Sequence, residues 1–389
     1  MKLSFTQILI DLHTAYLAAR HHKRSRQYQV DFENNMEENL KQLADELYHH
    51  IYKPRPSVCF VIEDPKKREV FAADFRDRIV HHLYYNYTHE LFERNFIADS
   101  YSCIKGRGTH YGISRLENHI RKESLNYTEK VYILKMDISG YFMHIDRSLL
   151  LKITQTRLAK IRWHKISSHS SEVWDDVVDF DFVNYLSENI ILINPTENCV
   201  FHGKKSDWEG LPHNRSLFNS PEGCGLPIGN LTSQLFSNIY LSVFDDFMKR
   251  DIKVGRYGRY VDDFYVVSND KDYLRSLIPV VSAFLSARLK LSVNQSKTQI
   301  CASDSGVCFI GAYLKPHRRY ISRQTLRRIH KKLPKILNSR NSNQINSYLG
   351  ILSHYSAYKI TKRLFFSIQG KGGYFTKWMK KWVEYPLGN

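Results

Sequence analysis

The stretch RYVDDFYVVS, residues 259 to 268, places two adjacent carboxylates, Asp262 and Asp263, inside a run of β-branched and aromatic residues. Such a composition is typical of two short strands that meet at a turn. We therefore predict a tight hairpin with both aspartates at its tip. Asn-Gly or Asp-Gly would relieve the positive φ angles that these turns require, whereas Asp-Asp brings like charges together. A bound divalent cation would offset that repulsion, because hard cations bind carboxylate oxygens.

The Asp-Asp pair alone is weak support for a metal site, because the same dipeptide occurs at 175–176 and 245–246. A third carboxylate is needed. Asp137 ends the apolar strand expected at 131–138, and it would lie beside the hairpin if that strand joins the same sheet. Three carboxylates there would hold two divalent ions about 3.5–4 Å apart, as in nucleotidyl transfer, with Mg²⁺ as the expected metal. The alternative for Asp137 is a helix cap or a turn residue.

The charge balance favours a polyanionic partner. The chain has 389 residues, with 57 Lys and Arg against 39 Asp and Glu, and its net charge is +18. The excess is clustered at 21–26, 66–68, 318–332 and 377–382, so nucleic acid explains it better than a merely soluble basic surface does. Some of the 25 tyrosines and 21 phenylalanines suit base stacking beside these cations, although most are expected in the core.

The remaining composition favours a reduced compartment and no membrane. The six cysteines form no C-x-x-C pair and no spacing typical of zinc or disulfides. Charged residues interrupt the apolar positions of residues 1–26, so no signal peptide is expected. No apolar run approaches the roughly 20 residues that cross a bilayer. We therefore expect a cytoplasmic protein.

Apolar periodicity predicts an α+β chain. The expected helices cover 3–21, 33–52, the end of the segment 57–92, 149–161, 232–250, 271–289 and the basic region from about 320 onward. Strands are expected at the start of 57–92, at 131–138, in the hairpin, at 291–300 and at 307–316. The stretch 164–225 is polar and irregular.

Several motifs, in a fixed order, resemble those of reverse transcriptases from bacterial retroelements. Five ordered motifs leave little room for coincidence, and with two motifs upstream they cover about two thirds of the chain. The five are KMDISGYF (135–142), GLPIGNLTSQLFSNIYL (225–241), RYVDDF (259–264), LSVNQSKTQ (291–299) and CFIGAYLKP (308–316), and the upstream pair are DPKKREVFAADFRDRIVHH (64–82) and SYSCIKGRGTH (100–110).

The resemblance implies an RNA-directed DNA polymerase with right-hand polymerase architecture. Residues 1–125 would form N-terminal helices and fingers, 126–316 a palm with a finger insertion around 150–225, and 317–389 a helical thumb. The antiparallel palm sheet would bear the Y-x-D-D hairpin. Asp137, Asp262 and Asp263 would be catalytic, and together with Ile138 they would bind two Mg²⁺ ions, for which Mn²⁺ is the expected substitute.

Within this family the chain is most similar to the branch from diversity-generating retroelements. Most relatives carry Gln-Gly and Ser-Pro in the second motif, where this chain has Ile228-Gly229 and Ser233-Gln234. The resemblance implies an enzyme that copies a template-repeat RNA into DNA with frequent errors opposite adenine. Its expected partners are the template RNA, the RNA–DNA hybrid, deoxynucleoside triphosphates and a small accessory variability protein, in a bacterial or phage-encoded system.

The resemblance also assigns contacts to the incoming nucleotide. Phe142 would place its ring against the sugar and exclude a 2′-hydroxyl; the alternative is an ordinary core residue. Gly229 and Ser233 are small enough for the template–primer duplex to come close. Ile228 offers only apolar contact where a glutamine would donate hydrogen bonds, and we expect this to lower fidelity.

Basic residues in the motifs are candidates for phosphate contacts. Arg68 and Lys66 match the finger residues that bind the triphosphate, and Lys297 matches a lysine that could protonate pyrophosphate. Lys105 and Arg107 rank second, as contacts to the template backbone. The alternative for each is a solvated surface position. The thumb would bind the hybrid through its shape and backbone, in a salt-dependent manner.

Two other functions remain open at this point. The first is a reverse transcriptase of a phage-defence system or a retron, which flanking DNA would distinguish. The second belongs to another class: a non-catalytic RNA-binding scaffold with a polymerase fold. The presence of all three aspartates and Phe142 disfavours the scaffold. Primer extension on an RNA template decides between an enzyme and a scaffold.

Overall fold

The computed structural model describes the chain except for residues 1–2, 22–25, 64–65, 167–170, 340–341 and 362–389. The basic cluster at 377–382, most of the one at 21–26 and the end of the predicted thumb lie outside the described residues. The chain divides into two compact units that alternate along the sequence. The first comprises 1–108, 134–266 and 272–299, and the second comprises 109–133, 267–271 and 300–389. The three-lobe boundaries at 125 and 316 stay a prediction.

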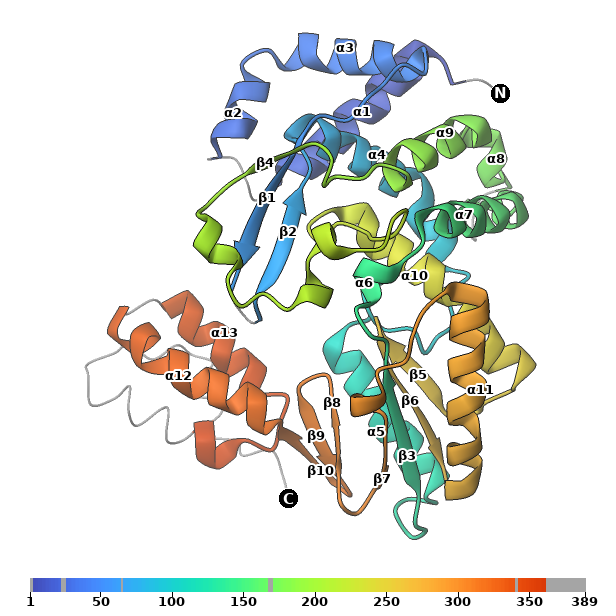
Figure 1. Cartoon of the computed structure of the whole chain (residues 1–389), viewed down its shortest axis with the longest axis vertical. Helices are drawn as coiled ribbons and strands as arrows, with labels where there is room; N and C mark the ends of the chain where they lie inside the picture. Colours follow the sequence, from blue (N-terminus) through green and yellow to red (C-terminus); the bar gives the residue numbers. More distant parts are fainter. Residues whose placement is uncertain (1–2, 22–25, 64–65, 167–170, 340–341, 362–389) are drawn as a thin grey trace. The chain divides into compact units, whose positions relative to one another are not determined.

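The first unit begins with a helical layer (Figure 1). Helices α1 (Phe5–Arg20), α2 (Gln27–Glu33) and α3 (Met36–Tyr48) pack with the long helix α4 (Phe75–Glu93). Side-chain caps fix the helix starts: Ser4 accepts a hydrogen bond from the Gln7 amide, and Asp74 accepts one from the Arg76 amide. Helices α1, α3 and α4 confirm the helices expected in the first 92 residues, with the predicted helix 33–52 shortened to α3. Helix α2 was not predicted.

A three-stranded sheet of order β2-β1-β4 follows (Figure 1). Strands β1 (Ser57–Ile62) and β2 (Arg68–Ala72) are antiparallel, so the basic segment KKR lies at the tip of a hairpin. Strand β4 (Cys199–Phe201) runs parallel to β1. The buried carboxylate of Glu69 accepts hydrogen bonds from Trp208, Ser216 and the Leu217 amide, which fastens the irregular segment 202–225 to β2.

The sheet that carries the aspartates has the order β5-β6-β3-β7. Its strands are β5 (Tyr257–Tyr260), β6 (Asp263–Ser268), β3 (Tyr132–Asp137) and β7 (Gln299–Ala302). Five consecutive residues of β6, Phe264 to Ser268, are buried, because both faces of this central strand are covered. The predicted hairpin and the predicted strand ending in Asp137 are both confirmed. Helix α10 (Leu231–Asp246), also predicted, is buried along most of its length.

The first unit contains further helices. They are α6 (Tyr141–His144), α7 (Arg147–Ile161), α8 (Trp174–Val177), α9 (Phe180–Ile191) and α11 (Lys271–Leu289). The strand predicted at 291–300 is largely wrong. Residues Gln295–Lys297 form a 3₁₀ turn, and only the last residues of the segment enter β7.

The second unit contains helix α5 (Thr109–Glu123) and a sheet of order β10-β9-β8. Strands β8 (Val307–Phe309) and β9 (Ala312–Lys315) form the predicted hairpin, to which β10 (Arg318–Ile321) adds a strand that the sequence did not suggest. Helices α12 (Arg323–Ser339) and α13 (Ser342–Leu352) confirm the helical character predicted after 320.

Candidate active site

The hairpin and strand β3 bring the three aspartates to neighbouring strands. Tyr260 pairs with Asp263, so Asp262 occupies the two-residue turn and Asp263 is the first residue of β6. Asp137 is the last residue of β3, which lies next to β6. The amide of Ile138 donates a hydrogen bond to the carbonyl oxygen of Asp262 at 3.2 Å, which joins the two segments at this end of the sheet. Ile138 itself is buried, so only its backbone could face an ion.

The electrostatics of the hairpin aspartates are those of crowded, partly desolvated carboxylates. Burial raises the pKa of Asp262 to about 6, and the neighbouring charge of Asp137 adds to the effect. Burial likewise raises the pKa of Asp263 to about 6, despite the opposing effect of Lys135. One oxygen of Asp263, Oδ1, is buried with no hydrogen-bond partner. Such a group is short of positive charge, which a cation would supply.

Two lysines contact these carboxylates. Lys297 donates hydrogen bonds to both oxygens of Asp137 at 2.8 Å, and Lys135 lies 3.2 Å from Asp263. Among the residues that the structure describes, no three histidine, cysteine or acidic side chains are already arranged to hold a metal ion. The all-oxygen donor set and the unsatisfied Asp263 oxygen fit a hard divalent cation. Binding would require the lysine ammonium groups to give way.

Phe142 and Ile228 lie in one apolar cluster. Both are partly buried against Cys59, Phe71 and other core side chains. The Ile228 carbonyl accepts a hydrogen bond from the Phe71 amide at 2.9 Å, so the second motif is fastened to strand β2. The predicted substrate residues of two distant motifs therefore come together beside the finger sheet. The alternative for Phe142 as a core residue agrees with its partial burial, and the contact to a nucleotide stays a prediction.

Gly229 is required by the protein rather than by space for a duplex. Its φ is +130°, and a Cβ there would lie 2.8 Å from Val70 Cγ1 and 2.9 Å from the Phe71 carbonyl oxygen. Strand β2 thus fills the space that a side chain at this position would occupy, and the approach of the template–primer duplex stays a prediction. Ser233 is likewise buried in α10, with 4% of its surface exposed. Gly229 therefore permits close packing of the second motif against β2.

The basic finger residues form a cluster of like charges. Burial lowers the pKa of Lys66, and Arg215, Lys297 and Arg68 lower it further. Because these neighbouring cations repel one another, an anion bound among them would be stabilised. Lys67, which lies between Lys66 and Arg68 in the sequence, instead donates a hydrogen bond to the Glu209 carbonyl at 2.6 Å.

Lys105 and Arg107, the two predicted contacts to the template backbone, have different surroundings. Lys105 is exposed. Arg107 donates hydrogen bonds to the carbonyls of Ile97 and Ser100 at 2.7 and 2.9 Å, so its guanidinium supports the protein backbone. The template contact predicted for Arg107 would have to compete with these bonds.

Comparison with known proteins decides the family. Residues 64–351 match the family described as reverse transcriptase (RNA-dependent DNA polymerase). The chain belongs to this family. The match includes all three aspartates, so the enzyme class predicted from the motifs, an RNA-directed DNA polymerase, is confirmed. Enzymes of this family generally use divalent metal ions. Protein YkfC of Escherichia coli (strain K12) is a distant relative, 23% identical over 310 residues that cover 70% of each protein.

Solved structures show the fold of this reverse transcriptase. Telomerase from Candida albicans, in complex with the TWJ fragment of telomeric RNA, has a TM-score of 0.51 at 13% identity, over 92% of this chain and 62% of that one. Apo telomerase from Candida tropicalis, truncated from its C-terminal domain, has a TM-score of 0.48 at 12% identity, over 69% and 55%. The chain thus spans less than two thirds of these telomerases. The α+β right-hand polymerase architecture is confirmed.

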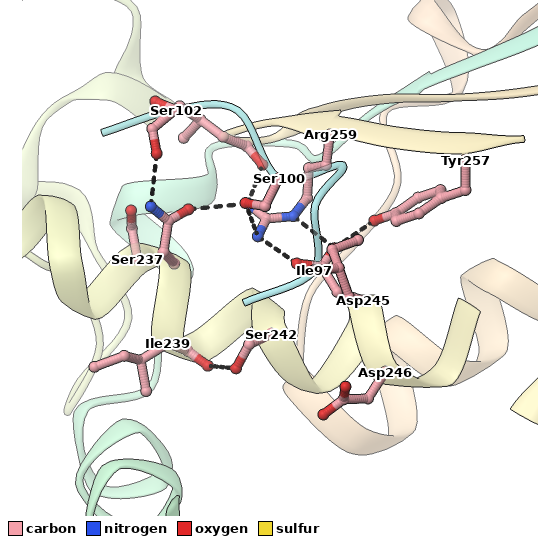
Figure 2. Close-up of polar contacts among 12 residues, drawn as sticks. Ile97, Ser100, Ser102, Ser237, Ile239, Ser242, Asp245, Asp246, Tyr257 and Arg259 are labelled. Carbon is pink, nitrogen blue, oxygen red and sulfur yellow. Dashed lines mark hydrogen bonds and ion pairs between the residues drawn. The ribbon is translucent and has the colours of Figure 1, made fainter. Parts of the chain in front are cut away.

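Two residues outside the predicted site, Lys135 and Arg259, support the hairpin of the reverse transcriptase. Lys135 is two residues before Asp137, and strand alternation could have placed both on one face of β3. Arg259, at the start of the quoted hairpin, is fully buried and binds Asp245 of α10 (Figure 2). No local pattern indicates this pairing. Within the described ranges, none of the helices combines the length and apolar character needed to cross a membrane.

Proposed function

We propose that this reverse transcriptase copies a template-repeat RNA into adenine-mutagenic cDNA for a diversity-generating retroelement, with a small accessory variability protein as its partner. The observation that carries this proposal is Ile228, an apolar residue where most relatives have glutamine. Its side chain packs in the same cluster as Phe142, the predicted neighbour of the nucleotide sugar. An apolar group there gives the incoming base no fixed hydrogen bond, so selection among bases depends more on shape and less on polar contacts.

The aspartates are proposed to carry the chemistry. Asp137, Asp262 and Asp263, with the backbone of Ile138, would hold two Mg²⁺ ions, which would activate the primer 3′-hydroxyl and stabilise the leaving pyrophosphate. The raised pKa of Asp262 and Asp263 supports this role, because both carboxylates gain from a cation. Lys297 contacts Asp137 and would be released to the triphosphate as the site fills.

The nucleotide would be held between the finger hairpin and α6. Lys66 and Arg68 lie at the tip of the β1–β2 hairpin, and their mutual repulsion favours a bound triphosphate. Phe142 would reject ribonucleotides through contact with the 2′-hydroxyl. Exposed rings beside the same sheet suit a single-stranded template: Phe201 of β4 stacks on Phe218 of the turn Leu217–Asn219, with ring centroids 5.6 Å apart and planes at 16°.

Primer extension on an RNA template that contains adenines tests the proposal. The wild-type protein should incorporate wrong nucleotides opposite adenine more often than opposite the other bases, when the cDNA is sequenced. Ile228→Gln should lower this error frequency by about tenfold, the scale on which a polar contact changes selectivity. Ile228→Leu keeps an apolar side chain and serves as the control. An error spectrum with no adenine bias, or flanking DNA without a repeat pair that differs at adenines, would favour the phage-defence or retron class.

A further inference from the structure

Arg259 is bound at every donor position that its side chain offers. Its Nε and Nη2 donate to the two oxygens of Asp245 at 2.9 and 2.6 Å, and Nη2 also donates to Ser100 Oγ at 3.1 Å. Its Nη1 donates to Asn238 Oδ1 at 3.3 Å and to the Val261 carbonyl at 3.0 Å. These bonds use all five N–H donors of the guanidinium. The side chain is 1% exposed, so this geometry is fixed by its surroundings (Figure 2).

We infer that Arg259 is the positioning residue of the catalytic turn, with Asp245 as its anchor on α10. The inference rests on the proposed role of Asp262 as a metal-binding carboxylate. Val261, the first turn residue, has a φ of +56°, a conformation that β-branched residues rarely adopt. Such strain persists only where neighbouring groups hold the backbone in place. The bond from Arg259 to the Val261 carbonyl is one that does so.

The peptide unit after Val261 links this bond to the active site. Because a peptide unit is planar, fixing the Val261 carbonyl oxygen also fixes the amide nitrogen of Asp262. On the other side, the Asp262 carbonyl accepts the hydrogen bond from Ile138. Asp262 is thus held between a buried arginine and strand β3, and both bonds act on its backbone rather than on its carboxylate. The Asp262 carboxylate stays available for an ion, while the backbone from which this side chain extends is held in place.

The same arginine joins a third segment to the turn. The Arg259 amide donates to the Asp99 carbonyl at 2.8 Å, and the Tyr101 amide donates to the Arg259 carbonyl at 3.0 Å. With the side-chain bond to Ser100, this fastens the start of the motif SYSCIKGRGTH beside β5. That motif therefore contributes to the geometry of the turn through Ser100, and Arg107 supports it from the Ser100 carbonyl.

Arg259→Lys tests the inference, because lysine keeps the charge but offers a single donor group with three hydrogens. The rate of single-nucleotide incorporation per active site, from burst amplitudes, is measured against Mg²⁺ concentration. We expect a maximal rate about 10–100-fold lower, as for small displacements of catalytic groups, and a higher Mg²⁺ half-saturation. Affinity for the template–primer duplex should not change. Asp246→Asn alters the neighbouring carboxylate, which faces Arg157, and should leave both kinetic values unchanged.

A purely structural role would lower the amount of folded protein but leave the rate per active site and the Mg²⁺ half-saturation as in the wild type, and this result would overturn the inference. If the wild-type protein itself extends no primer, the proposed function fails and the inference fails with it. This result differs from an active wild-type protein whose rate is unchanged by Arg259→Lys, which overturns the inference alone.

Val261→Gly gives a second test, in which the effect of Arg259→Lys on the rate per active site is compared between two backgrounds. Glycine adopts positive φ without strain, so the turn needs less support from Arg259. The loss caused by Arg259→Lys should therefore be smaller in the Val261→Gly background than in the wild-type background. If the two substitutions lower the rate by independent, multiplying factors, Arg259 does not act through the turn.

Discussion

Two Asp-Asp pairs of this chain have the same sequence and opposite surroundings. Asp245 and Asp246 end helix α10, and both are bound by arginines: Asp245 by the buried Arg259 at 2.6 Å and Asp246 by Arg157 at 2.6 Å. Asp262 and Asp263 lie at the hairpin, where burial raises the pKa of each to about 6. The first pair is charge-compensated, and the second is short of positive charge.

The difference shows what distinguishes a structural pair from a reactive one. A buried arginine satisfies Asp245 through a fork of two parallel hydrogen bonds, and Tyr257 adds a third bond at 2.7 Å. At the hairpin, Lys135 lies 3.2 Å from Asp263, yet one oxygen of Asp263 stays unsatisfied. Without a metal ion the hairpin pair is therefore destabilising, and a bound cation at the proposed site would relieve this cost.

The largest expected effect is on nucleotide incorporation. Asp262→Asn or Asp263→Asn should lower its rate about 10³-fold or more, because a metal-binding carboxylate contributes several kcal/mol to transition-state stabilisation. Primer extension gives the rate, and fluorescence anisotropy with labelled RNA should show nearly unchanged binding. Asp246→Asn, which changes an Asp-Asp pair elsewhere, is the matched control. Continued synthesis by the hairpin variants would show that these aspartates are not catalytic.

The next effect is on stability, and it separates the two members of the α10 pair. Asp245→Asn leaves the charge of Arg259 buried without its counter-ion, which should cost about 3–5 kcal/mol of unfolding free energy. Asp246→Asn removes a partly exposed ion pair and should cost about 0–1 kcal/mol. Urea unfolding followed by circular dichroism measures both. Equal midpoints for the two variants would show that the Arg259 network contributes little to stability.

Much of this fold followed from local sequence patterns. The hairpin at 257–268 and strand β3 were predicted because β-branched and aromatic residues surround three carboxylates, and α10 because its apolar residues recur at helical spacing. Strand β10 was not predicted. Its sequence, RRYI, is basic and short, and it becomes a strand through pairing with β9. Pairing of this kind depends on tertiary context more than on propensity.

The candidate site was predictable only in part, for the same reason. Motif order identified the aspartates, Phe142 and Ile228. Asp245 and Ser100 lie 14 and 159 residues from Arg259 in sequence, so nothing near the hairpin indicates its buried network. The contact between Gly229 and β2 was not predicted, since the proximity of β2 depends on how the second motif folds back on the finger sheet.

The smallest expected effect is a pH dependence of stability that arises at the hairpin pair. Because the folded-state pKa of Asp262 lies above the ordinary value of 3.8, the folded protein binds its proton more tightly than the unfolded chain does. Stability therefore falls as pH rises from about 4 to 6, and the ionised carboxylate remains costly above this range.

Asp262→Asn removes that cost, so in EDTA it should raise the unfolding free energy by about 2 kcal/mol at pH 8 and much less at pH 4. Asp262→Glu keeps a carboxylate and should keep the wild-type trend. Thermal melts at the two pH values decide the matter: if Asp262→Asn destabilises the protein at pH 8, the hairpin pair is compensated like the pair on α10, and the contrast between them disappears.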